Sequence, residues 1–198
     1  SNCKNGGKVE HTSATAAGEQ AVAGICGCPQ TGTIFNDCVN LASAEIIGGG
    51  KTGSGYDIGG IAGGPSSSDI EFNRCKNYGT VKHTVQHSNS TYVGGIAGYG
   101  YAFKQFVGCE NHGQVSTAGS TGTAYIGGIV SWGRIPSDTN QSASTRIMKN
   151  CVNYANLDFG GNAGGTMHAG GIAGRMNDED ASKKKFLNYL ANTNFVLK

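Results

Sequence analysis

The chain has 198 residues, of which 34 are glycine and 3 are proline, and its formal net charge is +2. A glycine content this high without a Gly-X-Y period excludes a collagen-like chain, and a near-neutral chain without a basic stripe is not expected to bind nucleic acid. No apolar run approaches the length of about 18 residues that a membrane-spanning helix needs, so direct insertion into a membrane is not expected.

One sequence unit recurs along the chain. Each copy begins with a Cys-x-Asn motif and closes with Gly-Gly-Ile or a close variant. Successive motif cysteines are separated by 35, 37, 34 and 42 residues, and a fainter copy begins at Leu190. Self-similarity at a period in this range is the signature of a repeat architecture. We therefore predict one repeat domain over residues 1–198 with a period near 36, its units lying near 1–34, 35–71, 72–105, 106–146 and 147–185, with a partial unit or cap at 186–198.

The residues within a unit alternate with a period of two. Cys, Asn, a small residue and an aliphatic residue occupy every second position, which places them on one face of an extended strand. The Gly-Gly-Ile segment is short, rich in β-branched residues and bounded by glycine, which is also typical of a strand. A unit this small cannot bury its own apolar face, so neighbouring units must stack. We predict an all-β parallel β-solenoid of about five coils.

The first predicted strand of a unit has an apolar anchor shortly before the cysteine. The anchors are Phe35, Phe72, Phe106, Ile147 and Phe186. The cysteines should form a ladder of buried thiols, because equivalent side chains one coil apart lie about 4.8 Å from each other, a longer spacing than a disulfide prefers. The ladder cysteines are Cys3, Cys38, Cys75, Cys109 and Cys151.

The motif asparagines follow and are predicted to form a ladder at a turn, in which each side-chain amide donates to and accepts from its neighbours. They are Asn5, Asn40, Asn77, Asn111, Asn153 and Asn192. An aliphatic ladder should come next, formed by Val9, Ala44, Val81, Val115 and Leu157. The Gly/Ser/Thr-rich segments after it, such as 83–91 and 116–124, are predicted to be surface loops.

The Gly-Gly-Ile motif is predicted to form a second strand and a bend. Its isoleucines should form another inward ladder, made by Ile25, Ile61, Ile96, Ile129 and Ile172. Just after the motif, successive units place Tyr99, Trp132 and Arg175 in a surface column, with Tyr101 and Arg134 beside it. Aromatic rings next to arginine suit glycan stacking or a protein-binding hot spot. The alternative is that these side chains only cover the corner of the coil.

The pairing of Gly-Gly-Ile-Ala-Gly at 94–98 with Cys-x-Asn-x-Gly-x-Val at 75–81 resembles the GLUG-type Gly-rich repeats of bacterial surface proteins. Such repeats occur in large proteins of Bacteroides-like bacteria and beside immunoglobulin-A-specific metalloendopeptidases. The resemblance extends from Cys3 to about Val196. It implies an extracellular β-solenoid that acts as a stalk, spacer or adhesive surface. The first unit has no apolar anchor before Cys3 and the last stops after Val196 without its Gly-Gly-Ile half, so we expect a fragment of a longer secreted protein with further domains. It transfers no catalytic residue, and the chain has no His-Glu-x-x-His motif.

Few residues suggest chemistry. Cys26 and Cys28 have no second cysteine pair to complete a zinc site, and His83 with His87 supplies only two ligands, so neither metal nor cofactor is predicted. The carboxylates offer no pair that could be nominated as general acid and base. Those considered are Asp57, Asp69 and Glu71.

We therefore expect a non-catalytic extracellular module of a bacterial surface protein that acts in adhesion or binds a host glycan or protein. One alternative is a purely structural stalk. Another is a glycan-active β-helix enzyme, which would require a charged cleft that spans several coils.

Overall fold

The computed structural model describes residues 1–15, 18–50, 54–64, 69–86, 88–101, 103–135, 147–160 and 165–178. Within these ranges the regular secondary structure consists of β-strands, and the strands pair in parallel. In the same ranges, no helix is long and apolar enough to cross a membrane. The predicted fold class, an all-β parallel solenoid, is confirmed.

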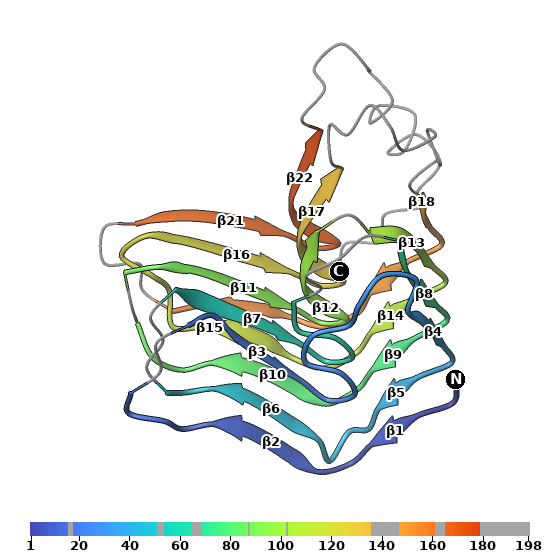
Figure 1. Cartoon of the computed structure of the whole chain (residues 1–198), viewed down its shortest axis with the longest axis horizontal. Helices are drawn as coiled ribbons and strands as arrows, with labels where there is room; N and C mark the ends of the chain where they lie inside the picture. Colours follow the sequence, from blue (N-terminus) through green and yellow to red (C-terminus); the bar gives the residue numbers. More distant parts are fainter. Residues whose placement is uncertain are drawn as a thin grey trace.

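Three of the five sheets contain one strand from each of five successive units, and Figure 1 shows these strands lying one above another. Sheet 1 is formed by β1 (Lys4–Asn5), β5 (Val39–Asn40), β9 (Lys76–Asn77), β14 (Glu110–Asn111) and β19 (Val152–Asn153). Sheet 2 is formed by β2 (Lys8–His11), β6 (Glu45–Gly48), β10 (Thr80–His83), β15 (Val115–Thr117) and β20 (Leu157–Phe159). Sheet 3 is formed by β3 (Gln20–Ala23), β7 (Gly55–Gly59), β11 (Ser90–Gly94), β16 (Thr123–Gly127) and β21 (Thr166–Gly170).

The other two sheets are smaller. Sheet 4 is formed by β12 (Ala97–Tyr101), β17 (Val130–Ile135) and β22 (Ala173–Asp178). Sheet 5 is formed by β4 (Ile34–Asn36), β8 (Ile70–Asn73), β13 (Phe103–Val107) and β18 (Ile147–Lys149). Isolated bridges from Cys26 to Ala62 and from Ala62 to Ala97 replace sheet 4 in the first units. A complete turn supplies one strand to each of the five sheets. About three such turns are present, from β8 to β22, slightly fewer than the five coils predicted.

Equivalent residues of successive units pair in register. Asn40 is the partner of Asn5 on one side and of Asn77 on the other, and Phe72 pairs with both Phe35 and Phe106. Parallel pairing in register places like side chains directly above one another, as the repeat predicts.

Two positions of the predicted ladders are wrong. The partner of Val9 and Val81 on β6 is Ile46 rather than Ala44. The second unit has two additional residues at this corner, where the amide of Ala44 donates to the carbonyl of Leu41 at 2.9 Å and closes a turn.

The anchor of the fifth unit is Met148, not Ile147. Met148 pairs with Phe106, whereas Ile147 pairs with Gln105 on the opposite face of the strand. Successive side chains of a strand point to opposite faces, so a shift of one residue moves the anchor out of the core. Phe186 lies outside the described residues.

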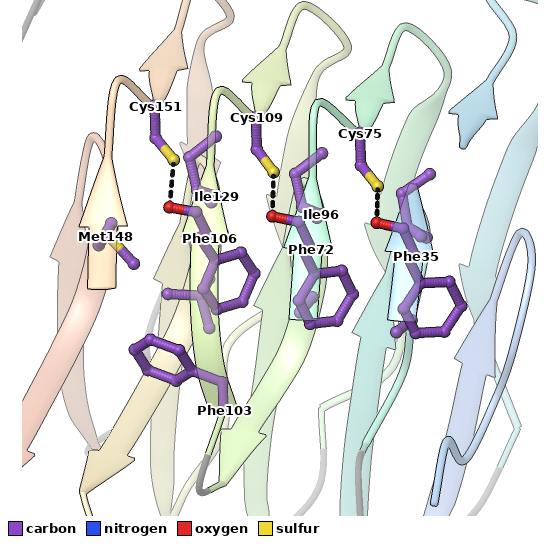
Figure 2. Packing of buried hydrophobic residues seen from close by; sticks show 14 of the residues in the cluster. Phe35, Phe72, Cys75, Ile96, Phe103, Phe106, Cys109, Ile129, Met148 and Cys151 are labelled. Carbon is purple, nitrogen blue, oxygen red and sulfur yellow. Dashed lines mark hydrogen bonds between the residues drawn. The ribbon is translucent and has the colours of Figure 1, made fainter. Parts of the chain in front are cut away.

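The interior is filled by two apolar clusters. The first contains the anchors, the thiols and the motif isoleucines, and the rings of Phe35, Phe72 and Phe106 stack with centroids 5.0 and 4.6 Å apart (Figure 2). The second lies between sheets 2 and 3 and contains Tyr56 and Ile58.

The segments predicted as surface loops contribute to this interior. His83, Thr91, Thr117 and Ser120 are all buried. Residues 84–86 lie between the strands and are exposed, as predicted for a surface loop. The prediction was wrong at His83, Thr91 and Thr117, because strands of sheets 2 and 3 extend into segments whose composition is typical of loops.

Candidate functional site

The bend between sheets 3 and 4 is shaped by the glycine pair of each motif. A Cβ on Gly94 would lie 1.9 Å from the carbonyl oxygen of Ala97, and a Cβ on Gly95 would lie 2.2 Å from that of Gly128. It would also lie 2.4 Å from Cγ of Asn111, so each coil packs its second glycine against the asparagine ladder. The bend predicted at the Gly-Gly-Ile motif is confirmed, and the backbone approaches too closely there for a side chain. The sharp bend places side chains of sheet 4 beside the outward face of sheet 3.

The predicted surface column follows this bend in register. Tyr99 on β12 pairs with Trp132 on β17, and Trp132 pairs with Arg175 on β22. The backbones of Tyr101 and Arg134 are also partners, but their side chains lie outside the described part of the structure.

A second column, which the sequence analysis missed, lies against the first. Tyr92, Tyr125 and His168 occupy equivalent outward positions of sheet 3, and their rings stack with centroids 4.9 and 5.0 Å apart. The Trp132 ring lies nearly parallel to those of Tyr92 and Tyr125, at centroid distances of 5.5 and 5.3 Å. The shared position of the two tyrosines before their Gly-Gly pairs was a usable signal.

Arginine completes the group. The Arg175 guanidinium lies over the Trp132 ring at 5.7 Å from its centroid, and its Nη1 donates to the Tyr125 hydroxyl at 3.4 Å. The combined group is called the aromatic face below, and it comprises Tyr92, Tyr99, Tyr125, Trp132, His168 and Arg175.

The aromatic face is partly accessible. Tyr125 is buried, while the other five side chains are half-buried. Burial raises the pKa of Tyr92 to about 12, so its hydroxyl is neutral at physiological pH. Trp132 Nε1 is buried and has no hydrogen-bond partner among the described residues. The face can therefore offer ring edges, hydroxyls, an imidazole and one guanidinium to a ligand.

A separate column of rings lies outside sheet 1. Tyr78, His112 and Tyr154 stack with successive centroids 4.6 Å apart, and Tyr78 and Tyr154 are 39% and 46% exposed. The ring faces cover one another, so mainly ring edges point to solvent. This column, called the outer ring column below, was also missed, although its residues directly follow the motif asparagines.

The predicted asparagine ladder is present in full over the described residues. Each side-chain Nδ2 donates to Oδ1 of the next asparagine, at 2.9, 2.7, 2.7 and 2.8 Å from Asn5 to Asn153. Asn77 Nδ2 also donates to the carbonyl of Gly79 at 3.0 Å, which fixes the corner. Asn192 lies outside the described residues.

The cysteine ladder is likewise structural. The prediction of buried thiols is confirmed for Cys38, Cys75, Cys109 and Cys151, and none of the seven cysteines forms a disulfide. It is wrong for Cys3, which lies in the first coil and is exposed, because only the following coil packs against it. Figure 2 shows three thiols pointing at phenylalanine carbonyls of the preceding coil. Their sulfur–oxygen distances, 3.5, 3.4 and 3.5 Å, belong to Cys75–Phe35, Cys109–Phe72 and Cys151–Phe106.

Burial raises the pKa of the Cys109 thiol well above its ordinary value. A buried thiol of this kind packs as a small apolar group and is not a nucleophile.

The remaining histidine and carboxylate candidates do not form a metal site or a catalytic pair among the described residues. In the described residues no group of three or more His, Cys, Asp or Glu side chains could hold a metal ion. His83 is buried, with Nδ1 3.2 Å from Thr117 Oγ1, and His87 lies outside the described residues. Glu71 forms an ion pair with Lys104 at 2.6 Å.

Comparison of the chain with protein-family models, curated proteins and solved structures found no match.

Proposed function

We propose that this chain is a non-catalytic repeat module of a bacterial surface protein that binds a glycan or protein ligand through the aromatic face. The observation on which the proposal rests is the column in which Tyr99, Trp132 and Arg175 follow one another in register on the outside of the stack. Half-buried aromatic rings beside an arginine are typical of glycan sites and of protein-binding hot spots. The surface location and the bacterial origin derive from the resemblance to GLUG-type repeats.

Binding of the purified chain to a glycan array tests this proposal directly. Binding to mucin, a glycoprotein, is measured beside it. Trp132→Ala and Arg175→Ala should each weaken binding about tenfold or more, because each removes one side of the stacked pair. Tyr154→Ala is the matched control, since it removes an equally prominent tyrosine from the outer ring column. A folded wild-type protein that binds no glycan and no mucin, or binding that survives both substitutions, would contradict the proposal.

A structural spacer is the second candidate, and ion pairs between coils favour it. Arg74 binds Asp37 of the preceding coil through two hydrogen bonds of 2.8 and 2.7 Å. Further pairs join neighbouring coils, namely Lys76–Glu110, Lys82–Glu45 and Lys104–Glu71. Exposed pairs of this kind add little individually, but they resist sliding of one coil over another. A chain that folds normally but binds neither the array glycans nor mucin would support the spacer function.

A further inference from the structure

Asp57 is a carboxylate that the solenoid buries on its outward side. It lies on β7 between Tyr56 and Ile58, which both point into the second apolar cluster, so its own side chain points outward. It is nevertheless only 3% exposed. A Cβ on Gly64 would lie 1.8 Å from Asp57 Oδ2, so the backbone after the bend passes directly over the carboxyl. In the next coil the equivalent position holds Tyr99, which packs on Tyr92 instead.

Within the described ranges the buried carboxyl lacks a compensating partner. Its Oδ1 accepts no hydrogen bond from these residues, and none of their cationic side chains pairs with it. Its neighbours in register are Ala21 on β3 and Tyr92 on β11. Burial, and then the negative charge of Glu19 just before β3, raise the pKa of Asp57 well above its ordinary value.

The other titratable groups packed around this corner are not cationic. Tyr92 faces the carboxyl from β11, Tyr99 stacks on Tyr92 from β12, and Cys28 lies in the coil below Gly64. An ionised carboxylate without a partner is costly in such surroundings, so the group stays protonated while the corner remains closed.

We propose that Asp57 is a pH-sensitive element of the fold: the bend at 59–64 closes over the neutral carboxyl, and ionisation of that carboxyl loosens the corner at the end of the aromatic face. Tyr92, the partner of Asp57 in register, stacks on Trp132, so the loosened corner adjoins the proposed binding surface. The inference concerns stability and does not depend on the proposed ligand binding.

The direction of the pH dependence follows from linkage. The carboxyl has a higher pKa in the folded chain than in the unfolded chain, where it lies at about 3.9. The contribution of the closed corner is therefore fully present below that value and is lost as pH rises toward the raised pKa.

Urea unfolding of the wild type and of Asp57→Asn, measured from pH 4 to pH 8, tests the proposal. The ratio of the unfolding equilibrium constants, wild type over variant, should rise with pH by up to about tenfold per unit over the interval between the two pKa values. Asp57→Ala should show the same trend, because Ala21 already occupies the equivalent position of β3. Asp158→Asn, which removes an exposed carboxylate of β20, should follow the wild type at every pH.

A ratio that stays constant or falls from pH 4 to pH 8 would overturn the proposal. Amide hydrogen exchange at pH 7 adds a local readout. Residues 60–64 should exchange more slowly in Asp57→Asn than in the wild type, while sheet 2 stays unchanged. Equal protection at 60–64 in both proteins would also overturn it.

Discussion

Replacement of Asn77 by alanine should be among the most destabilising single changes in the solenoid. Asn77 is fully buried in the middle of the asparagine ladder. It accepts from Asn40 Nδ2 at 2.7 Å, donates to Asn111 Oδ1 at 2.7 Å and donates to the Gly79 carbonyl at 3.0 Å. The substitution removes all three bonds and leaves buried donor and acceptor groups on the neighbouring coils.

The expected magnitude follows from those orphaned groups. A buried polar group that loses its partner costs about 1–3 kcal/mol. Two orphaned groups lie on neighbouring coils, a donor on Asn40 and an acceptor on Asn111, and together they should lower the free energy of unfolding by about 2–6 kcal/mol. The carbonyl of Gly79, which also loses its partner, adds to this cost. Asn5→Ala is the matched control at the end of the ladder. It removes one inter-coil bond from a partly exposed site, so its cost should be about 1 kcal/mol.

Equilibrium unfolding in urea, followed by far-ultraviolet circular dichroism, measures both values. The slope against urea should stay similar in the two variants, so that the difference appears in the midpoint. An Asn77→Ala cost no larger than that of Asn5→Ala would refute the reasoning. It would mean that the ladder amides find other partners when one rung is missing.

Two further predictions concern the glycines and the thiols. Gly95→Ala should prevent formation of the native fold, because its Cβ would lie 2.2 Å from the Gly128 carbonyl oxygen. Gly18→Ala is the control, because a Cβ added there would have no atom within 4 Å. A cooperative thermal unfolding transition of Gly95→Ala at the wild-type temperature would contradict this packing. In the reduced native protein a thiol reagent should modify the exposed Cys3 and Cys28 within minutes, whereas the buried Cys75, Cys109 and Cys151 should react only after unfolding. Mass spectrometry of samples taken at successive times measures the labelling. Early labelling of Cys109 would argue against a closed interior.

Much of the fold could be predicted because the repeat keeps the same residue types at the positions that pack in the interior. Asn40, Asn77 and Asn111 each stand two residues after the motif cysteine of their unit, so the ladder followed from parallel stacking alone. Ala44 and Ile46 are both apolar, both buried and two residues apart, so both fit the same face of the strand. Only the turn at Leu41 decides between them, and the pattern of alternation does not show it.

The error at Ile147 was avoidable, since each earlier anchor stands three residues before its cysteine. That spacing selects Met148 before Cys151. Isoleucine fits a core position by residue type, but a shift of one residue along the strand moves the side chain to the opposite face.

The candidate site was predicted only in part, because it depends on the angle between two sheets. The register of Tyr99, Trp132 and Arg175 follows from the repeat. Their packing against Tyr92 and Tyr125 requires the sharp bend at the glycine pair, which alternation within a strand does not specify.

The central claim is that successive units stack in parallel, with like residues directly above one another. Solution NMR with assigned asparagine side chains tests it most directly. We expect nuclear Overhauser contacts between the amide protons of Asn40, Asn77 and Asn111 in sequence along the column. Close Hα–Hα contacts between the Gly-Gly-Ile strands, as antiparallel pairs show, with no contacts among those amides, would contradict the account.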